Sequence, residues 1–174
     1  LIGYRAGKDS NTNNNVGIGM EAMCTFNGVE SVGVGYQALY QQGSYSVGVG
    51  YQAGFSGQST GCVSFGYQAG QANQGSSSLA IGYQAGRSQQ NRDSIAIGYL
   101  SGTNSQASGC ISIGFTSGNT SQLRESIAIG NLAGNANAGP GVITIANATT
   151  NMNTNSIAIG PSQPTTRQAT NSVY

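Results

Sequence analysis

Histidine is absent from this chain of 174 residues, and charged residues make up only 6% of it. The absence of histidine removes the most common general base and the most common neutral metal ligand of enzymes. The net charge of +1 leaves neither a basic patch for nucleic acid nor an acidic field. Proline contributes three residues, and the 28 glycines follow no Gly-X-Y period, which excludes collagen. No run of about eighteen apolar residues occurs, so we expect no membrane insertion of this segment.

A short apolar triplet recurs along the whole chain, at intervals of sixteen residues with one interval of fifteen and one of fourteen. We call the residue that closes each triplet the anchor and number the other positions of a repeat from it. The anchors are Gly3, Gly19, Gly35, Gly50, Gly66, Gly82, Gly98, Gly114, Gly130, Ala146 and Gly160. A fixed short period means that each repeat is one structural unit stacked on the next. The sequence therefore predicts a single repeat array over residues 1–174, with an irregular turn near 139–160 and a continuation beyond Tyr174.

Positions −3 and −1 are Val or Ile in most repeats, and the residue between them is small. This alternation predicts a short strand with two unlike faces. We expect the −3 and −1 side chains to fill the interior and the −2 side chains to pack against a neighbouring chain. The predicted core is Val32, Val34, Val47, Val49, Ile95, Ile97, Ile111, Ile113, Ile127 and Ile129. The candidate oligomer face is Gly33, Gly48, Ser64, Ala80, Ala96, Ser112 and Ala128.

Two further columns indicate ladders between stacked repeats. Aromatic residues recur at +1 and glutamines recur at +8. If successive repeats stack as parallel strands about 4.8 Å apart, the rings stack and the amides bond from turn to turn. The ladder residues are Tyr36, Tyr51, Tyr67, Tyr83, Tyr99, Gln58, Gln74, Gln90, Gln106 and Gln122.

A repeat of sixteen residues has room for two short strands and two corners, with glycines at the anchor and at +4. The fold class predicted is therefore all-β: a parallel β-solenoid, or β-roll, of about eleven 16-residue turns and roughly 50 Å in length.

Acidic residues offer the only conceivable catalytic pair. Asp93 and Glu125 share position −5 two turns apart, about 10 Å by the strand spacing, a separation that a glycosidase pair tolerates. Because Arg92 and Arg124 stand beside them and no insertion interrupts the array, we interpret them as solvated corner charges. We predict no catalytic residue, and no enzyme.

The three cysteines do not predict a disulfide or a metal site. Cys62 and Cys110 replace serine at −4 three turns apart, about 14 Å by the strand spacing. Disulfides need Cα atoms within about 7 Å. Zinc is not expected without histidine or a close cysteine pair. We predict no cofactor and no metal, and interpret these two cysteines as small, partly buried residues of a serine column; the alternative is a contact between symmetry-related copies near an oligomer axis.

The pentapeptide Ser-(Val/Ile)-(Ala/Gly)-(Val/Ile)-Gly, as in 94–98 and 126–130, resembles the head repeats of YadA-like trimeric autotransporter adhesins and the shaft repeats of phage and viral tail fibres. The resemblance covers nearly the whole chain. It implies a left-handed parallel β-roll with three chains side by side. The adhesin heads have shorter turns, so the regular sixteen residues with Tyr-Gln-Ala-Gly are more similar to the fibre shafts.

These observations lead to one functional hypothesis and two alternatives. The first is a non-enzymatic structural or adhesive fibre segment, a homotrimeric rod at an extracellular, cell or virion surface. It would mediate attachment or present a binding tip, with a host or cell-surface protein or glycan as receptor. The alternatives are a single-chain solenoid that binds a ligand lattice such as ice, and a functional-amyloid-like filament that grows through open strand edges.

Overall fold

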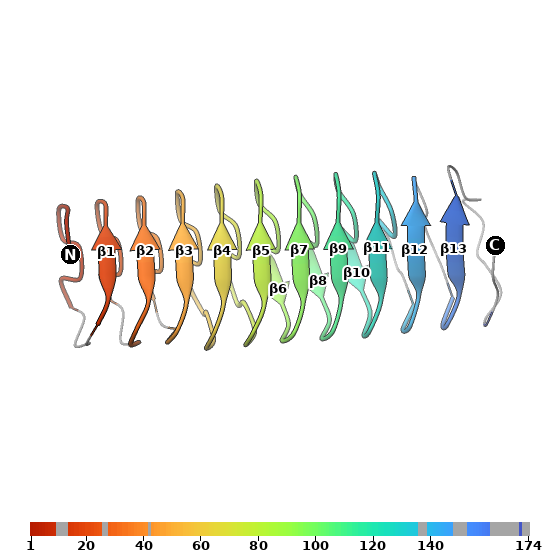
Figure 1. The fold of residues 1–174 in the computed structure, drawn as a ribbon, viewed down its shortest axis with the longest axis horizontal. Helices are drawn as coiled ribbons and strands as arrows, with labels where there is room; N and C mark the ends of the chain where they lie inside the picture. The colour runs from red at the N-terminus through yellow and green to blue at the C-terminus, as the bar shows by residue number, and fades with distance from the viewer. Residues whose placement is uncertain are drawn as a thin grey trace.

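A computed structural model describes residues 1–9, 14–25, 28–41, 43–135, 139–147, 153–160 and 171. Within these ranges every regular element is a β-strand, and the strands stack in parallel into an elongated solenoid (Figure 1). The predicted all-β parallel solenoid is thereby confirmed. The count of eleven turns, the hand and the trimer stay predictions.

The main sheet has ten short parallel strands in chain order along the rod. They are β1 (Val16–Ile18), β2 (Val32–Val34), β3 (Val47–Val49), β4 (Val63–Phe65), β5 (Leu79–Ile81), β7 (Ile95–Ile97), β9 (Ile111–Ile113), β11 (Ile127–Ile129), β12 (Ile143–Ala146) and β13 (Ile157–Gly160). Equivalent positions pair even across the short repeats: Val32 pairs with Val47, and Ile143 with Ile157. The strands thus keep register. The fifteen- and fourteen-residue repeats are shorter only in the chain that connects one main-sheet strand to the next. Part of the irregular turn predicted near 139–160 lies outside the described residues.

A second sheet runs behind the first, in the segments that connect successive strands of the main sheet (Figure 1). Its strands are β6 (Ser88–Gln90), β8 (Asn104–Gln106) and β10 (Thr120–Gln122), and bridges from Ser56 to Ala72 and from Ala72 to Ser88 extend it. Its outward column at +7 is polar, and Ser105 Oγ donates to Gln89 Oε1 at 2.9 Å.

The chain turns between the sheets through corner residues with left-handed backbone at +2, +4, +7 and −5. In one turn these are Gln52, Gly54, Gly57 and Gly61, with φ between 50° and 73°. The anchor glycines have a different requirement. A Cβ on Gly82, whose φ is 125°, would lie 2.5 Å from the next anchor's carbonyl oxygen, so only glycine fits.

The orientation predicted for the strands is wrong: the −2 side chains are interior, and the −3 and −1 side chains point outward. In most strands of the main sheet the middle residue is buried and its two neighbours are partly or well exposed. The residues predicted as core are therefore outward: Val32, Val34, Val47, Val49, Ile95, Ile97, Ile111, Ile113, Ile127 and Ile129. The residues predicted as oligomer face are interior: Gly33, Gly48, Ser64, Ala80, Ala96, Ser112 and Ala128.

The reason for this inversion is the small space between the two sheets. Positions −4, −2, +3, +4 and +8 all contribute buried side chains, so little volume remains for each. In the regular turns glycine stands at +4, a small residue at −2, and the long glutamine at +8 fills the remaining space.

Towards the N-terminal end the interior is filled differently. Met23 and Leu39 take position +4, and both are buried and in contact. A Cβ on Gly48 would lie 2.7 Å from Leu39 Cγ, so the larger residue at +4 requires glycine at −2. The interior thus changes from apolar to polar between Leu39 and Gln58.

Candidate interaction surfaces

The outer face of the main sheet is an uninterrupted apolar strip. Its two columns, −3 and −1, hold twenty side chains, all Val, Ile, Leu or Phe. They range from partly buried to the 57% exposure of Ile159. Nine strand spacings give the strip a length of roughly 43 Å. Exposed apolar surfaces of this continuity are typical of sites that interact with other macromolecules or with membranes.

The aromatic ladder follows directly after the strands, at +1. Consecutive rings from Tyr36 to Phe115 stack with centroids 5.0–5.1 Å apart and interplanar angles of 6–13°. The rings from Tyr51 to Phe115 are 42–53% exposed. Each ring covers the face of the next, so mainly ring edges meet the solvent. Stacking contributes about 0.5–1.5 kcal/mol per pair, which makes the ladder a structural element of the rod.

A second ladder, at +2, was missed from the sequence. The amides of Gln52, Gln68 and Gln84 each donate to the glutamine one turn towards the N-terminus, at 2.8–3.1 Å. Gln37 donates to Glu21 Oε2 at 2.8 Å, and Glu21 forms an ion pair with Arg5 at 2.9 Å. All amide dipoles point the same way, with the carboxylate at their donor end, where negative charge is favoured. The sixteen-residue spacing of glutamine within Tyr-Gln-Ala-Gly was the signal for this ladder.

The +8 glutamines form a buried ladder in the interior rather than a binding surface. Gln58 Nε2 donates to Gln74 Oε1 at 2.6 Å, and the Gln74–Gln90 and Gln106–Gln122 bonds are 3.2 and 3.3 Å long. The Oε1 atoms of Gln58 and Gln106 are buried without a partner in the described structure. The ladder therefore lacks a rung between Gln90 and Gln106.

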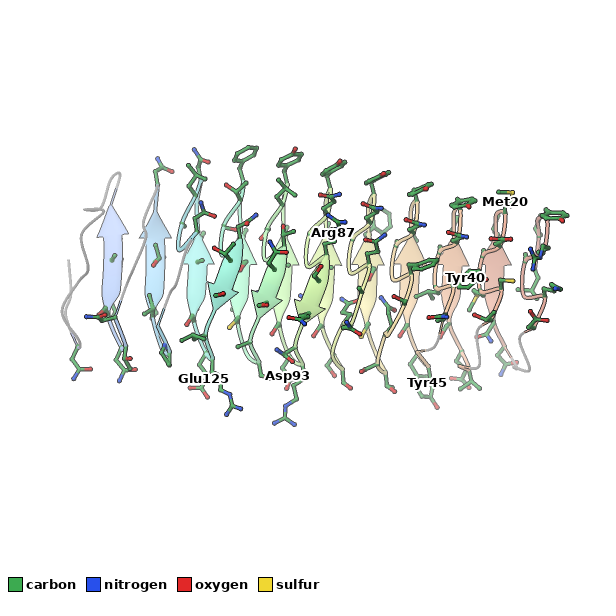
Figure 2. The ribbon with its side chains drawn as sticks, turned by 180° about the vertical axis from the view of Figure 1, so that it is seen from behind. Met20, Tyr40, Tyr45, Arg87, Asp93 and Glu125 are labelled. Carbon is green, nitrogen blue, oxygen red and sulfur yellow. The ribbon has the colours of Figure 1, made fainter. Side chains whose placement is uncertain are left out.

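The acidic corner residues are exposed and remain apart from any built site. Asp93 and Glu125 lie at the corner before the main-sheet strands, where Arg92 and Arg124 are also exposed (Figure 2). Over the described ranges, no three His, Cys, Asp or Glu side chains come close enough together to hold a metal ion.

The three cysteines are buried and unpaired with one another. Cys62 Sγ donates to the Gly75 carbonyl at 3.0 Å, and Cys110 Sγ to the Leu123 carbonyl at 2.9 Å. Burial raises the pKa of both thiols above the usual value. Both are thus protonated and unreactive, and act as small interior residues.

Two hollows adjoin Gln58, and neither was foreseen from the sequence. The first, of about 620 Å³, is lined by Gly28, Gly43, Ser44, Gln58, Ser59, Thr60 and Ser76. The second, of about 490 Å³, is lined by Thr25, Gln41, Gly57 and Gln58. The sequence feature that could have predicted these hollows is the fifteen-residue interval between Gly35 and Gly50, which places glycine instead of glutamine at +8.

None of the described residues form a helix with the length and apolarity to cross a membrane. Comparison of the chain with models of protein families, with curated proteins and with solved structures finds no significant match.

Proposed function

We propose that this chain is a non-enzymatic fibre segment, a rigid rod that packs side by side with further copies of itself at an extracellular, cell or virion surface. The apolar strip is the observation that carries this proposal. It runs along the rod over ten strands without a polar or charged side chain at −3 or −1. A second solenoid laid parallel to the first presents the same columns and would cover it. Three copies is the number that the sequence resemblance implies.

The energetics are compatible with this assembly. Most side chains of the strip are only partly exposed, so removing the exposed part of one from water contributes about 0.5 kcal/mol. Association costs roughly 4–15 kcal/mol in lost translational and rotational freedom. Full cover of the twenty side chains would contribute about 10 kcal/mol, which is of the same size as that cost.

The test is the mass of the purified chain in solution, by light scattering coupled to size exclusion, with and without reductant. We expect a discrete trimer in both conditions, because the thiols are buried. Ile113→Lys places a charge in the strip and should dissociate the assembly. Ser121→Lys adds the same charge to the exposed outward column of the second sheet and is the matched control. A monodisperse monomer at micromolar concentration would refute the proposal.

The two alternatives predict other outcomes of the same measurement. A single-chain lattice binder would be monomeric and active in a thermal-hysteresis assay. A filament would give an open-ended mass distribution. The outward column of the second sheet is not a regular threonine array, since it contains Asn73, Gln89, Ser105 and Ser121, so we favour the fibre segment.

A further inference from the structure

The larger hollow arises where the repeat is one residue short. In the regular turns a buried glutamine occupies +8, but in the fifteen-residue repeat Gly43 stands there. Leu39 fills the adjacent interior, so the ladder begins at Gln58, a residue that is 5% exposed and whose Oε1 has no partner among the described residues. At this place the surface has a local depression of about 620 Å³.

The lining of this hollow consists of unused hydroxyl groups. Those of Ser59, Thr60 and Ser76 make no hydrogen bond to another described residue, and Ser44 Oγ accepts only a 3.3 Å bond from the Val29 N–H. Each hydroxyl is both donor and acceptor. No charged side chain is among the described residues that line it. A ligand that matches this lining is itself neutral and rich in hydroxyl groups.

An aromatic side chain stands at the same corner. Tyr45 directly follows Ser44 in the chain and is 56% exposed (Figure 2). Its N–H donates to the Val29 carbonyl at 2.9 Å, which holds its backbone. Unlike the tyrosines of the +1 ladder, Tyr45 stacks on no other described ring, and its 56% exposure leaves part of the ring accessible to a ligand.

We propose that this hollow, with Tyr45 beside it, binds a neutral saccharide unit. The hydroxyls of Ser44, Ser59, Thr60 and Ser76 would bond sugar hydroxyls, and the C–H face of the sugar ring would pack on Tyr45. Glu30, one turn from Tyr45 in the same column, is exposed and disfavours anionic sugars. This inference rests on the proposed fibre function, for which it names the receptor class.

The experiment uses the assembled, isotope-labelled protein and follows backbone amides by NMR. The probes are the methyl glycosides of glucose, galactose, mannose and N-acetylglucosamine, and dextran as a neutral polysaccharide. We expect saturable shifts for Ser44, Ser59 and Thr60 with millimolar affinity for at least one glycoside. A response to dextran but to no glycoside would identify an internal chain unit as the ligand.

Variants separate the site from the scaffold. Ser76→Ala should weaken binding by about 2- to 10-fold through one lost hydrogen bond. Tyr45→Ala should weaken it by up to about 10-fold through lost ring packing. Ser108→Ala is the matched control, because it changes the same residue type in the same column two turns away from the hollow.

Three results would overturn the saccharide site. They are no shift of these amides with any probe, tighter binding of a sialylated or sulfated glycoside than of its neutral parent, and equal weakening by Ser108→Ala and Ser76→Ala. A discrete trimer with any of these results would refute the saccharide site and leave the fibre proposal intact. A monomer that binds saccharide would refute the fibre proposal and leave the saccharide site intact.

Discussion

Ala96→Ser should stabilise the chain, because it supplies the missing rung of the interior glutamine ladder. Two serines at −2 already bridge glutamines: Ser64 Oγ accepts from Gln58 Nε2 at 2.8 Å and donates to Gln74 Oε1 at 2.7 Å. Ser112 does the same between Gln106 and Gln122, at 3.2 and 2.6 Å.

Ala96 stands at the equivalent position between Gln90 and Gln106, and Gln106 Oε1 is the buried acceptor without a partner. Room for a hydroxyl exists, because the neighbouring +4 residue is Gly102, just as Gly118 lies beside Ser112. A serine at 96 would accept from Gln90 Nε2 and donate to Gln106 Oε1.

The expected gain is about 1 kcal/mol per chain. A hydrogen bond contributes roughly 0.5–1.5 kcal/mol net, and an unsatisfied buried polar group costs roughly 1–3 kcal/mol. Burying the new hydroxyl offsets part of the sum. For a chain of this size, 1 kcal/mol corresponds to a Tm increase of roughly 2–4 °C.

The assay is thermal unfolding followed by circular dichroism at one protein concentration for all variants. Ala80→Ser is the control, because Gln74 and Gln90, which it would bridge, are already bonded directly. A Tm for Ala96→Ser that is no higher than those of the wild type and of Ala80→Ser would refute the reasoning.

Four further predictions concern the anchor glycines, the +2 column and the thiols. Gly82→Ala should destabilise the chain by at least about 3 kcal/mol in urea unfolding, because its Cβ would lie 2.5 Å from a backbone oxygen; an unchanged urea midpoint would contradict this. Thr116→Leu should raise the free energy of unfolding in urea by about 1 kcal/mol, because Thr116 is β-branched at φ 49°, its hydroxyl is buried without a partner in the described structure, and leucines hold the same column in both neighbouring turns; a lower urea midpoint would show that the hydroxyl is needed. Cys62 and Cys110 should react with a thiol-specific disulfide reagent at mildly alkaline pH only after denaturation, and fast reaction of the folded protein would argue against their burial. Since their folded-state pKa is raised, the unfolded chain ionises first, and stability should fall as pH rises above about 8.5 towards the folded-state pKa.

The period of the sequence was sufficient to place the main-sheet strands and their register, because glycine, small and β-branched residues recur in fixed columns. Alternation alone, however, states that a strand has two unlike faces and not which one is interior. Which face is interior depends on the distance between the two sheets. That distance is set by the path of all sixteen residues around one turn. Gln90 and Ala96 are both buried in that space, and nothing in the strand itself reports it.

Of the ladders, some could be predicted from the sequence and one could not. The tyrosine column was readable because ring stacking needs only equal spacing along the rod. The bonds from Gln37 and Gln52 were not foreseen, because the spacing of the glutamines does not show that the left-handed backbone at +2 aligns successive amides. The interior is filled by Leu39 near the N-terminal end and by glutamines further on, and a hollow lies between them. Predicting this change requires the three-dimensional neighbours of Gly43 and Gly48.

The sameness of the apolar strip has a consequence for alignment. A neighbouring rod displaced by one whole turn would meet almost the same Val and Ile surface, so the strip by itself distinguishes poorly between aligned and shifted copies. Phe65 is the one aromatic side chain in its two columns and is 52% exposed. A shifted copy would set this ring against aliphatic side chains at the wrong height, whereas aligned copies bring their rings to a common level. In the proposed assembly, Phe65 would therefore favour the alignment in which identical chains lie at the same height along the rod.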